Sequence, residues 1–236
     1  MEKPLISVII PAYNEEKYIE KAINSIKQQS YNNTEVIVVA NNCRDKTAEI
    51  AAQSADIVLQ TDIQSIPFVK NLGVEHANGE IFVFMDADSM AKKDLLDKVY
   101  HYVSKGFDGG KARLRYVEGN NFIGLSRSFL SMIVGTISAL IPKKDFSGSG
   151  AFMFVTKNLF NKIKNVHGEG FNTKIRTLSD VDFLTRIKQN GKFKYITNSC
   201  LYTSMRRFNE EGHIKCMIED WSHVTNNNGQ TRKRWT

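Results

Sequence analysis

The sequence predicts an α/β fold built on a mostly parallel sheet, and three observations support this prediction. Short apolar segments rich in β-branched residues alternate with amphipathic segments of helical length through about the first 90 residues. Polar and acidic residues follow three of the apolar segments, as is typical of a ligand-binding sheet edge. With 42% hydrophobic and 24% charged residues, the 236-residue chain can bury a full core.

The first half of the chain is predicted to form strands separated by single helices. We expect strands at residues 5–12, 34–40, 56–60 and 80–86. We expect helices at residues 15–28, 45–55 and 67–77. Asp45 is a suitable N-cap for the second helix, and Pro67 opens the third. Strands that alternate with helices of this length favour parallel pairing through right-handed crossovers.

The second half of the chain has a less regular pattern. We expect strands at residues 109–117 and 150–155, and helices at residues 92–103, 122–141, 157–163 and 179–191. Gly135 should break or weaken the long apolar helix, while Ser179 and Gly191 should begin and end the last one. Because the sequence contains no repeat, low-complexity tract or linker, residues 1–236 are predicted to form one compact unit.

Composition and charge narrow the choice of compartment and partner. Three widely spaced cysteines favour neither a disulfide framework nor a zinc cluster, so a cytoplasmic setting is expected. The first ten residues do not resemble a signal peptide, and the longest uncharged run, which contains the 14 residues Ser128–Ile141, is shorter than the roughly 18–20 residues of a membrane span. The net charge of +7 favours nucleotide phosphates or an anionic membrane surface. Nucleic acid is disfavoured, because the basic residues are scattered.

Two carboxylates, Asp86 and Asp88, follow the fourth expected strand in the sequence MDADS. Two anions at this spacing repel each other unless a cation or several hydrogen-bond donors lie between them. Their hard oxygen atoms suit Mg²⁺ or Mn²⁺, which commonly bridge carboxylates to substrate phosphates. A structural alternative is that Asp88 or Ser89 caps the following helix. The phosphatase motif Asp-x-Asp-x-Thr/Val is disfavoured, because Met90 occupies its last position.

Four segments in register resemble the family 2 glycosyltransferases of GT-A fold. They read SVIIPAYNEEKYIEKAINSI, EVIVVANNCRDKTAEIA, PFVKNLGVEHANGEIFVFMDADS and GSGAFMFV…SDVDFLTRIKQNG, and together cover residues 5 to about 200. The resemblance implies an inverting transfer of sugar from a UDP- or GDP-sugar to an acceptor hydroxyl, with Mn²⁺ or Mg²⁺ as cofactor. It also implies a Rossmann-like nucleotide-binding half at about residues 1–90 and a smaller acceptor-binding, catalytic half at about residues 91–236.

The resemblance further implies roles for individual residues. Those expected to bind the nucleotide sugar are Pro11, Tyr13, Glu15, Asn41, Lys70, Asp86, Arg206 and Arg207, and those expected at the metal are Asp86, Asp88 and His213. Ala40 and Asn41 replace the usual Asp-Asp pair of the family; because an Asn both donates and accepts, the base is not fixed as uracil. Lys70 has a plain alternative as an exposed helical lysine, and His167 competes with His213 as the third metal ligand.

Asp180 is the residue that the resemblance implies as the catalytic base. The family usually has Glu-Asp at this point, and this chain has Ser179-Asp180. Taken alone, an Asp at this position could simply favour the helix N-terminus. Asp182 is the second choice for the base; Arg186, one turn later, could pair with it and would make Asp182 structural.

Two further segments are expected to surround the sugar. Ser149 and Gly150 resemble the small-residue segment that lets donor and acceptor approach the backbone, although a plain turn before the strand would also explain them. The polar loop at residues 164–177 is expected to order over the donor and to exclude water. Arg206 and Arg207 could neutralise the departing diphosphate, since guanidinium groups match phosphate oxygens.

Other functions and partners remain open at this point. The departures at Ala40, Asn41 and Ser179 give some weight to a non-catalytic nucleotide-sugar-binding protein. A sugar-phosphate nucleotidyltransferase is disfavoured, because PAYNEE contains no glycine. The acceptor, saccharide or lipid-linked, cannot be inferred.

The expected helix at residues 122–141 carries an apolar stripe. The stripe consists of Phe122, Leu125, Phe129, Met132 or Ile133, Ile137 and Leu140. Packing in the core or at a homodimer interface is the default interpretation. Peripheral contact with the inner face of a membrane is the alternative, given the basic surface.

Overall fold

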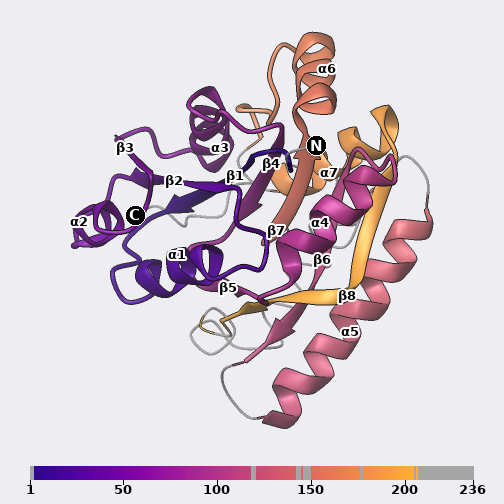
Figure 1. The fold of residues 1–236 in the computed structure, drawn as a ribbon, viewed down its shortest axis with the longest axis horizontal. Coiled ribbons are helices and arrows are strands. Elements are labelled where there is room, and N and C mark those ends of the chain that lie inside the picture. The colour runs from indigo at the N-terminus through magenta and orange to yellow at the C-terminus, as the bar shows by residue number, and fades with distance from the viewer. Residues whose placement is uncertain are drawn as a thin grey trace.

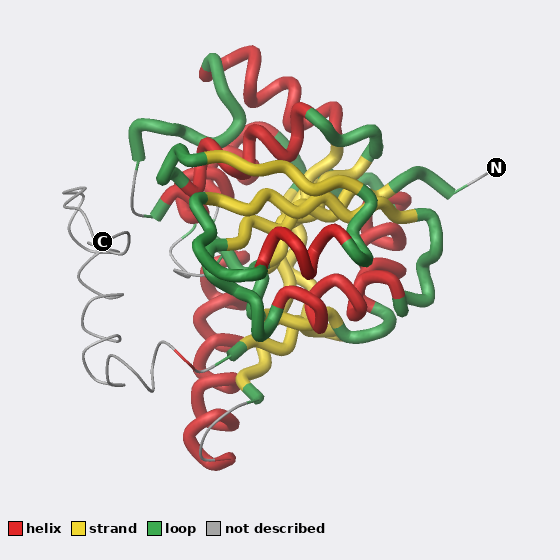
Figure 2. Tube along the Cα trace, turned by 90° about the vertical axis from the view of Figure 1, so that its left-hand side faces the viewer, coloured by secondary structure: helices red, strands yellow, loops and turns green. Residues whose placement is uncertain are grey.

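The computed structural model describes residues 3–117, 121–141, 145, 150–175, 178–204 and 206, with backbone only at 121–123. The strands are β1 (Ile6–Ala12), β2 (Thr34–Asn41), β3 (Ile57–Thr61), β4 (Ile81–Met85), β5 (Ser89–Ala91), β6 (Gly109–Tyr116), β7 (Phe152–Thr156) and β8 (Phe193–Thr203). The helices are α1 (Ile19–Lys27), α2 (Thr47–Ala52), α3 (Ile66–Glu75), α4 (Leu95–Ser104), α5 (Asn121–Leu140), α6 (Lys157–His167) and α7 (Ser179–Asn190). Figures 1 and 2 show the strands running through the middle of the molecule with helices on both faces.

Within these residues the strands form one mixed sheet in the order β3-β2-β1-β4-β7-β6-β8-β5. The four strands of the first half pair in parallel, as the sequence predicts. β7 then runs antiparallel to both β4 and β6, β8 runs parallel to β6, and β5 runs antiparallel to β8. As a result, the carboxyl ends of β1, β2, β3, β4, β6 and β8 meet the amino ends of β5 and β7 at one edge of the sheet.

Two apolar clusters, one on each face of the sheet, form the core. α1 and α4 pack on one face, and α3, α6 and α7 pack on the other. β1 contributes to both clusters, because Val8 is buried on the first face and Ile9 on the second. A strand covered on both faces needs an unbroken apolar run rather than an alternating one, which is the pattern seen in residues 8–12.

The ends of several helices differ from the expected positions. α2 begins at Thr47, so Asp45 is not its N-cap; its carboxylate instead accepts hydrogen bonds from the Thr47 amide (3.0 Å) and hydroxyl (2.5 Å). Ser179 is the first residue of α7 rather than its cap, because Leu178 occupies the cap position in a left-handed conformation. α6 continues to His167 and ends at Gly168, whose φ of 81° suits glycine.

Gly135 does not break α5, which runs without interruption from Asn121 to Leu140. The glycine is required by packing, since a Cβ at this position would lie 2.6 Å from the ring carbon Cζ and the hydroxyl of Tyr195 on β8. The prediction of a weakened helix is therefore wrong. The low helix propensity of glycine suggests a break at Gly135. In the structure, the glycine instead allows the helix to approach the sheet closely.

The apolar stripe of α5 is not part of the core. Leu125, Phe129, Ile133, Ile137 and Leu140 are exposed in the described part of the chain, so the default expectation of core packing is wrong for them. Met132 is half-buried, and the side chain of Phe122 lies outside the described residues. Figure 1 shows α5 along the flank of the molecule beside β6 and β8, where its opposite face packs.

A carboxylate holds the beginning of the sheet together. Glu35 on β2 accepts hydrogen bonds from the Ser7 hydroxyl (2.5 Å) and from the amides of Asn78 (2.7 Å) and Gly79 (3.2 Å). Burial acts to raise the pKa of Glu35, but these hydrogen bonds outweigh it and leave the pKa below its ordinary value of 4.5. The ionised form is therefore the one that links β1, β2 and the turn before β4.

We expect Glu35→Gln to lower the free energy of unfolding by roughly 1 kcal/mol at pH 7, because the charge-assisted hydrogen bonds are lost. Since the pKa of Glu35 is lower in the folded state, its contribution is complete above pH 4.5 and declines as the pH falls through the folded-state value. Urea denaturation at pH 7 and below pH 4 measures both. Glu49→Gln, at an exposed position on α2, is the control; an equal deficit at both pH values would contradict the prediction.

Candidate functional site

The expected site residues converge on the edge where the strand ends meet. Those that the edge brings together from the strand ends and their loops are Pro11, Tyr13, Glu15, Asn41, Asp86, Asp88, Gly150 and Arg206. Asp180 reaches the edge from the start of α7, and Lys70 approaches it from α3. Three predicted residues, Ser149, Arg207 and His213, lie outside the described residues.

A tight turn between β4 and β5 presents the two carboxylates. The Asp86 amide donates to the carbonyl oxygen of Ala151 (3.1 Å), and the Ser89 amide donates to the carbonyl of Asp86 (3.2 Å). Ser89 then enters β5, where its hydroxyl bonds the Thr203 hydroxyl at 3.0 Å. The following helix, α4, begins at Leu95 with Asp94 at its cap position. The alternative in which Asp88 or Ser89 caps that helix is therefore wrong, and the turn serves to place Asp86 and Asp88 at the sheet edge.

Arg206, the last described residue, links the loop after β1 to this turn. Its guanidinium donates to both carboxylate oxygens of Glu15, from Nη1 to Oε2 (3.0 Å) and from Nη2 to Oε1 (2.7 Å). The same Nη2 lies 3.6 Å from Oδ2 of Asp88, and the guanidinium carbon lies 5.0 Å from the ring centre of Tyr18. The hydrogen bond to Glu15 is the largest cause that raises the pKa of Arg206, against the effect of burial. A fixed positive charge therefore stands beside Asp88.

The two carboxylates suit a divalent cation. Mg²⁺ and similar ions at nucleotide sites often take only one or two carboxylates, with phosphate oxygens and water completing the shell. Asp88 already has a cation, the Arg206 guanidinium, as a neighbour. A preformed group of three His, Cys, Asp or Glu ligands is absent from the described part of the chain. His167, the alternative third ligand, is the last residue of α6, and its charge acts on Asp182.

Asp180 forms an ion pair with Lys70. Nζ of Lys70 donates to Oδ1 of Asp180 at 2.6 Å and lies 5.2 Å from the ring centre of Phe171. The Lys70 side chain is only 2% exposed, whereas Asp180 is 29% exposed. The interpretation of Lys70 as an exposed helical lysine is therefore wrong: its ammonium is buried behind the carboxylate that was predicted to be the base.

Gly150 touches Asp180 on the other side. A Cβ at position 150 would lie 2.3 Å from Cβ, Cγ and Oδ2 of Asp180, so only glycine fits there. A plain turn does not explain this requirement. The next residue, Ala151, accepts the hydrogen bond from the Asp86 amide. Two residues of backbone therefore separate the candidate base from the candidate metal turn.

Asp182 is anchored away from that role. Its Oδ2 lies 2.8 Å from Nε of Arg186, the i,i+4 pair expected from the sequence. Burial raises the pKa of Asp182 although the Arg186 charge opposes it. Arg186 also donates to the carbonyl of Gly170 (3.3 Å), so the pair ties α7 to the loop after α6.

That loop is held at its middle by Phe171. The Phe171 backbone exchanges two hydrogen bonds with the side chain of Asn71 on α3, at 2.8 and 2.9 Å. The Phe171 ring is fully buried and stacks on Phe183, with ring centres 3.9 Å apart. The described residues 168–175 therefore form an anchored connection after α6, and closure of the loop over a donor stays a prediction.

Asn41 carries a buried amide that has no hydrogen-bond partner within the described residues. The residue ends β2 and is 2% exposed, and neither Oδ1 nor Nδ2 finds a donor or acceptor there. Leaving a polar group in this state costs about 1–3 kcal/mol, so native structures rarely keep one without a ligand or another use. This amide is the observation that fits best with a bound base.

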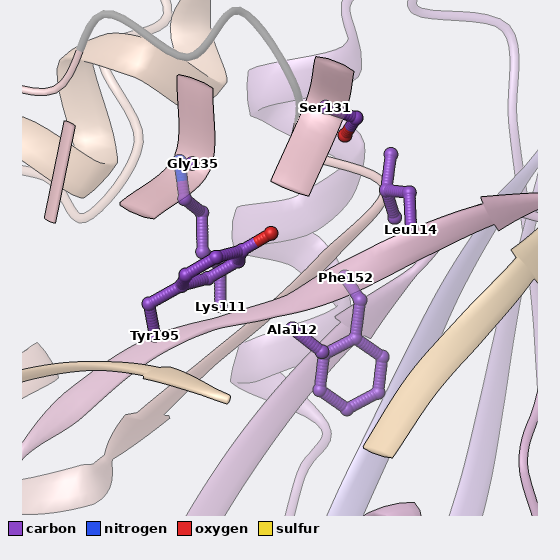
Figure 3. Close-up of a pocket in the computed structure, with 7 residues that line it drawn as sticks. All are labelled: Lys111, Ala112, Leu114, Ser131, Gly135, Phe152 and Tyr195. Carbon is purple, nitrogen blue, oxygen red and sulfur yellow. The ribbon is translucent and has the colours of Figure 1, made fainter. Parts of the chain in front are cut away.

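A buried ionic cluster beneath α5 was not predicted from the sequence. Asp145 is fully buried, with Oδ2 at 3.1 Å from Nζ of Lys111 and 3.3 Å from Nζ of Lys188. Burial lowers the pKa of Lys111 to about 8 despite the Asp145 charge. A small cavity of about 10 Å³ adjoins Lys111 and Tyr195, enough for about one water molecule (Figure 3). None of the candidate site residues lines it, and the cluster joins α5, β6 and α7.

The chain is thus a mixed α/β protein with an acidic turn at the edge where the carboxyl ends of its parallel strands meet. The sequence model of the family described as "Glycosyl transferase family 2" matches residues 7–164, more than half of the chain. The protein therefore belongs to glycosyltransferase family 2, as the resemblance implied.

Two curated relatives illustrate the sequence similarity. Glycosyltransferase AglE of Haloferax volcanii is 33% identical over 140 residues, which cover 55% of this chain and 46% of AglE. Glycosyltransferase GlyG of Streptococcus pneumoniae is 31% identical over 107 residues, which cover 43% of this chain and 36% of GlyG. The chain spans less than half the length of these relatives.

Two solved structures show the same fold. TarS of S. aureus (residues 1–349), solved in complex with UDP-GlcNAc, has a TM-score of 0.67 at 20% identity, over 84% of this chain and 58% of that one. The mannosyltransferase PcManGT of Pyrobaculum calidifontis, solved with GDP-Man and Mn²⁺, has a TM-score of 0.69 at 18% identity, over 98% of this chain and 66% of that one. The GT-A fold expected from the sequence is thereby confirmed. Among the described helices, none is long and apolar enough to cross a bilayer.

The Lys70–Asp180 pair makes a stability prediction. Asp180→Asn should lower the free energy of unfolding by about 2 kcal/mol, because the buried Lys70 ammonium loses its counter-charge. The double variant Lys70→Met/Asp180→Asn should recover most of this loss, since neither charge remains. Urea denaturation of the three proteins checks it. Lys92→Met, which removes an exposed ion pair with Asp94, should change stability by less than about 0.5 kcal/mol. Strict additivity of the Lys70 and Asp180 changes would show that the pair is not coupled.

Proposed function

We propose that this protein transfers a sugar from a nucleoside-diphosphate sugar to an acceptor hydroxyl, with inversion at the anomeric carbon and with Mn²⁺ or Mg²⁺ as cofactor. The observation that carries the proposal is the short Gly150–Ala151 segment, which contacts Asp180 on one side and bonds the Asp86 amide on the other. A catalytic base and a phosphate-binding turn must be near neighbours for one donor sugar to reach both, and here two residues of backbone connect them. Membership of glycosyltransferase family 2 supports the same reaction.

The buried amide of Asn41 supports a nucleotide base as part of the donor. Its Oδ1 can accept from a ring N–H while its Nδ2 donates to a neighbouring carbonyl oxygen. Uracil and guanine both present an N–H beside a carbonyl group, so UDP- and GDP-sugars remain the two candidates. The solved relatives include one complex of each kind, with UDP-GlcNAc and with GDP-Man. Pro11 and Tyr13, at the end of β1 and just beyond it, would line the nucleoside pocket.

Asp86 and Asp88 would hold the divalent cation, which when bound offsets negative charge on the diphosphate. Arg206, fixed by Glu15 and 3.6 Å from Asp88, would add a positive charge at the same place. This charge is available without rearrangement, because Glu15 already holds both terminal nitrogens of the Arg206 guanidinium. Arg207 and His213, outside the described residues, stay predicted ligands of the phosphates and the metal.

Asp180 would act as the base through Oδ2. Lys70 holds Oδ1, and Oδ2 lies against the bare backbone of Gly150; the Asp180 side chain is 29% exposed, and in this proposal Oδ2 is the oxygen that would meet an acceptor. The acceptor hydroxyl would pass its proton to this oxygen as it bonds to the anomeric carbon from the face opposite the diphosphate. The bond between the sugar and the diphosphate breaks with its electron pair on the leaving oxygen. Lys70 is therefore a positioning residue in this scheme, in place of the nucleotide contact that the sequence predicted.

A non-catalytic nucleotide-sugar-binding protein is the rival interpretation. It would keep the Asn41 and Asp88 contacts but would not need an oriented carboxylate at Asp180. Metal-dependent release of nucleoside diphosphate from a donor, tested over a panel of UDP- and GDP-sugars, separates an enzyme from a binder.

Nucleotide binding should depend on Mn²⁺ and on Asp88. We expect UDP or GDP with Mn²⁺ to raise the melting temperature by several degrees, because a ligand at about 100 times its Kd contributes about 2.7 kcal/mol. Asp88→Asn should lose most of this shift. Thermal denaturation with and without chelator measures it, and Glu75→Gln, at an exposed position on α3, should behave as the unaltered protein. A full shift in Asp88→Asn would remove Asp88 from the metal site.

The loss of Asp180 should largely abolish transfer even in the double variant, in which most of the stability is recovered. Asp180→Asn and the double variant Lys70→Met/Asp180→Asn should both lose about 10²- to 10⁴-fold in the rate of nucleoside diphosphate release, the usual contribution of a general base. Both should keep the Mn²⁺-dependent thermal shift, since the nucleotide contacts lie elsewhere. Asp182→Asn is the matched control and should retain activity. Wild-type turnover in the stable double variant would show that Asp180 is not the base.

A further inference from the structure

α5 presents a continuous row of large apolar side chains to solvent. The row, called the α5 apolar face here, consists of Leu125, Phe129, Leu130, Ile133, Ile137 and Leu140. Phe129 is 60% exposed and Leu140 is 79% exposed, so these side chains do not merely border the core. Figure 2 shows that one end of this long helix extends beyond the strands of the sheet.

The position of the helix is fixed by its other face. Gly135 packs on the ring of Tyr195, and Arg113 on β6 lies 3.7 Å from the sulfur of Met132. Ser138 belongs to the buried ionic cluster, where its hydroxyl donates to Oδ2 of Asp145 at 3.0 Å. The exposure of the α5 apolar face therefore belongs to a firmly packed helix.

The size of the row separates it from the scattered apolar residues of ordinary surfaces. Single exposed leucines or valines need no explanation. Here Leu125, Phe129, Ile133, Ile137 and Leu140 recur every three or four positions, with Leu130 beside Phe129, over a length of roughly 22 Å along a helix. A contiguous apolar surface of this kind is typical of an interaction site.

The charged residues of the α5 segment, between Glu118 and the buried Asp145, are all basic. From residue 119 to residue 144 the sequence contains no Asp or Glu, and its only charged residues are Arg127, Lys143 and Lys144. β6, the strand on which α5 packs, adds the half-buried Arg113 and the exposed Arg115. A second copy of the chain would bring this basic region against itself, which like-charge repulsion disfavours. A surface of anionic lipid headgroups is complementary to it.

We propose that the α5 apolar face docks on a bilayer that contains anionic lipids. The apolar side chains would enter the boundary between headgroups and acyl chains, and the basic residues would meet lipid phosphates. The helix would lie in the surface, in keeping with the finding that none of the described helices can span a membrane. β6 ends at the edge that carries the candidate site, and α5 follows it, so a docked bilayer would lie next to that edge.

The test is co-sedimentation of the full chain with vesicles of phosphatidylcholine alone or mixed with phosphatidylglycerol. We expect binding to the mixed vesicles at low salt, with weaker binding at high salt because the lipid charges are screened. Phe129→Ser/Ile137→Ser should lower the partition coefficient by about tenfold for each side chain removed. Val166→Ser is the matched control, since Val166 is 64% exposed on α6, away from the row.

Three outcomes would overturn the proposal. Failure of the unaltered chain to sediment with mixed vesicles is the first. The second is equal binding by the double variant. The third is a dimer in light scattering that the double variant loses without any vesicle binding, which would make the row a contact between copies. Because vesicle binding needs neither donor nor metal, its failure leaves the proposed transfer reaction untouched. An unchanged melting temperature and an unchanged Mn²⁺–nucleotide shift show that the variants are folded.

Discussion

The buried ammonium of Lys70 is the constraint on which the arrangement of the site depends. A positive charge at this depth is tolerated only with a counter-charge in direct contact, and Asp180 supplies it. Lys70 belongs to α3 in the first half of the chain, and Asp180 belongs to α7 in the second. The pair therefore sets how the two helices meet, and with it the distance from the Asp180 carboxylate to the strand ends.

Backbone geometry completes what this pair begins. β7 enters the sheet antiparallel to β4, which brings its first residues to the edge where the parallel strands end. That reversal allows Gly150 to contact Asp180 while Ala151 bonds Asp86. Arg206 performs a similar task for two loops of the edge, because it joins the loop after β1 to the turn before β5. The site is therefore assembled from the ends of elements that are distant in sequence.

Local pattern predicted the elements of the first half and all those of the second except β5 and β8, but it did not predict how the second-half strands pair. β-branched runs and amphipathic spacing predict β1 to β4, because parallel strands covered on both faces leave a strong signal. β5 is only three residues long and depends on β8, so no local signal marks it. Gly135 was misread for a related reason, and the alternative of Lys70 as an exposed lysine fails for the same one: their surroundings come from Tyr195 and Asp180, far away in the chain. Asp45, by contrast, was misplaced by one residue, because Lys46 occupies the cap position of α2.

The amide of Asn41 shifts a cost from one process to another. Because its polar atoms are already dehydrated in the folded chain, the free energy of removing water from them is part of folding. A ligand that reaches Asn41 meets a group that has no solvent left to give up, and so gains the full strength of each hydrogen bond. Preorganisation of this kind makes the ligand-free protein less stable while it strengthens ligand binding. A substitution that removed the unpaired amide would therefore stabilise the free protein and weaken binding.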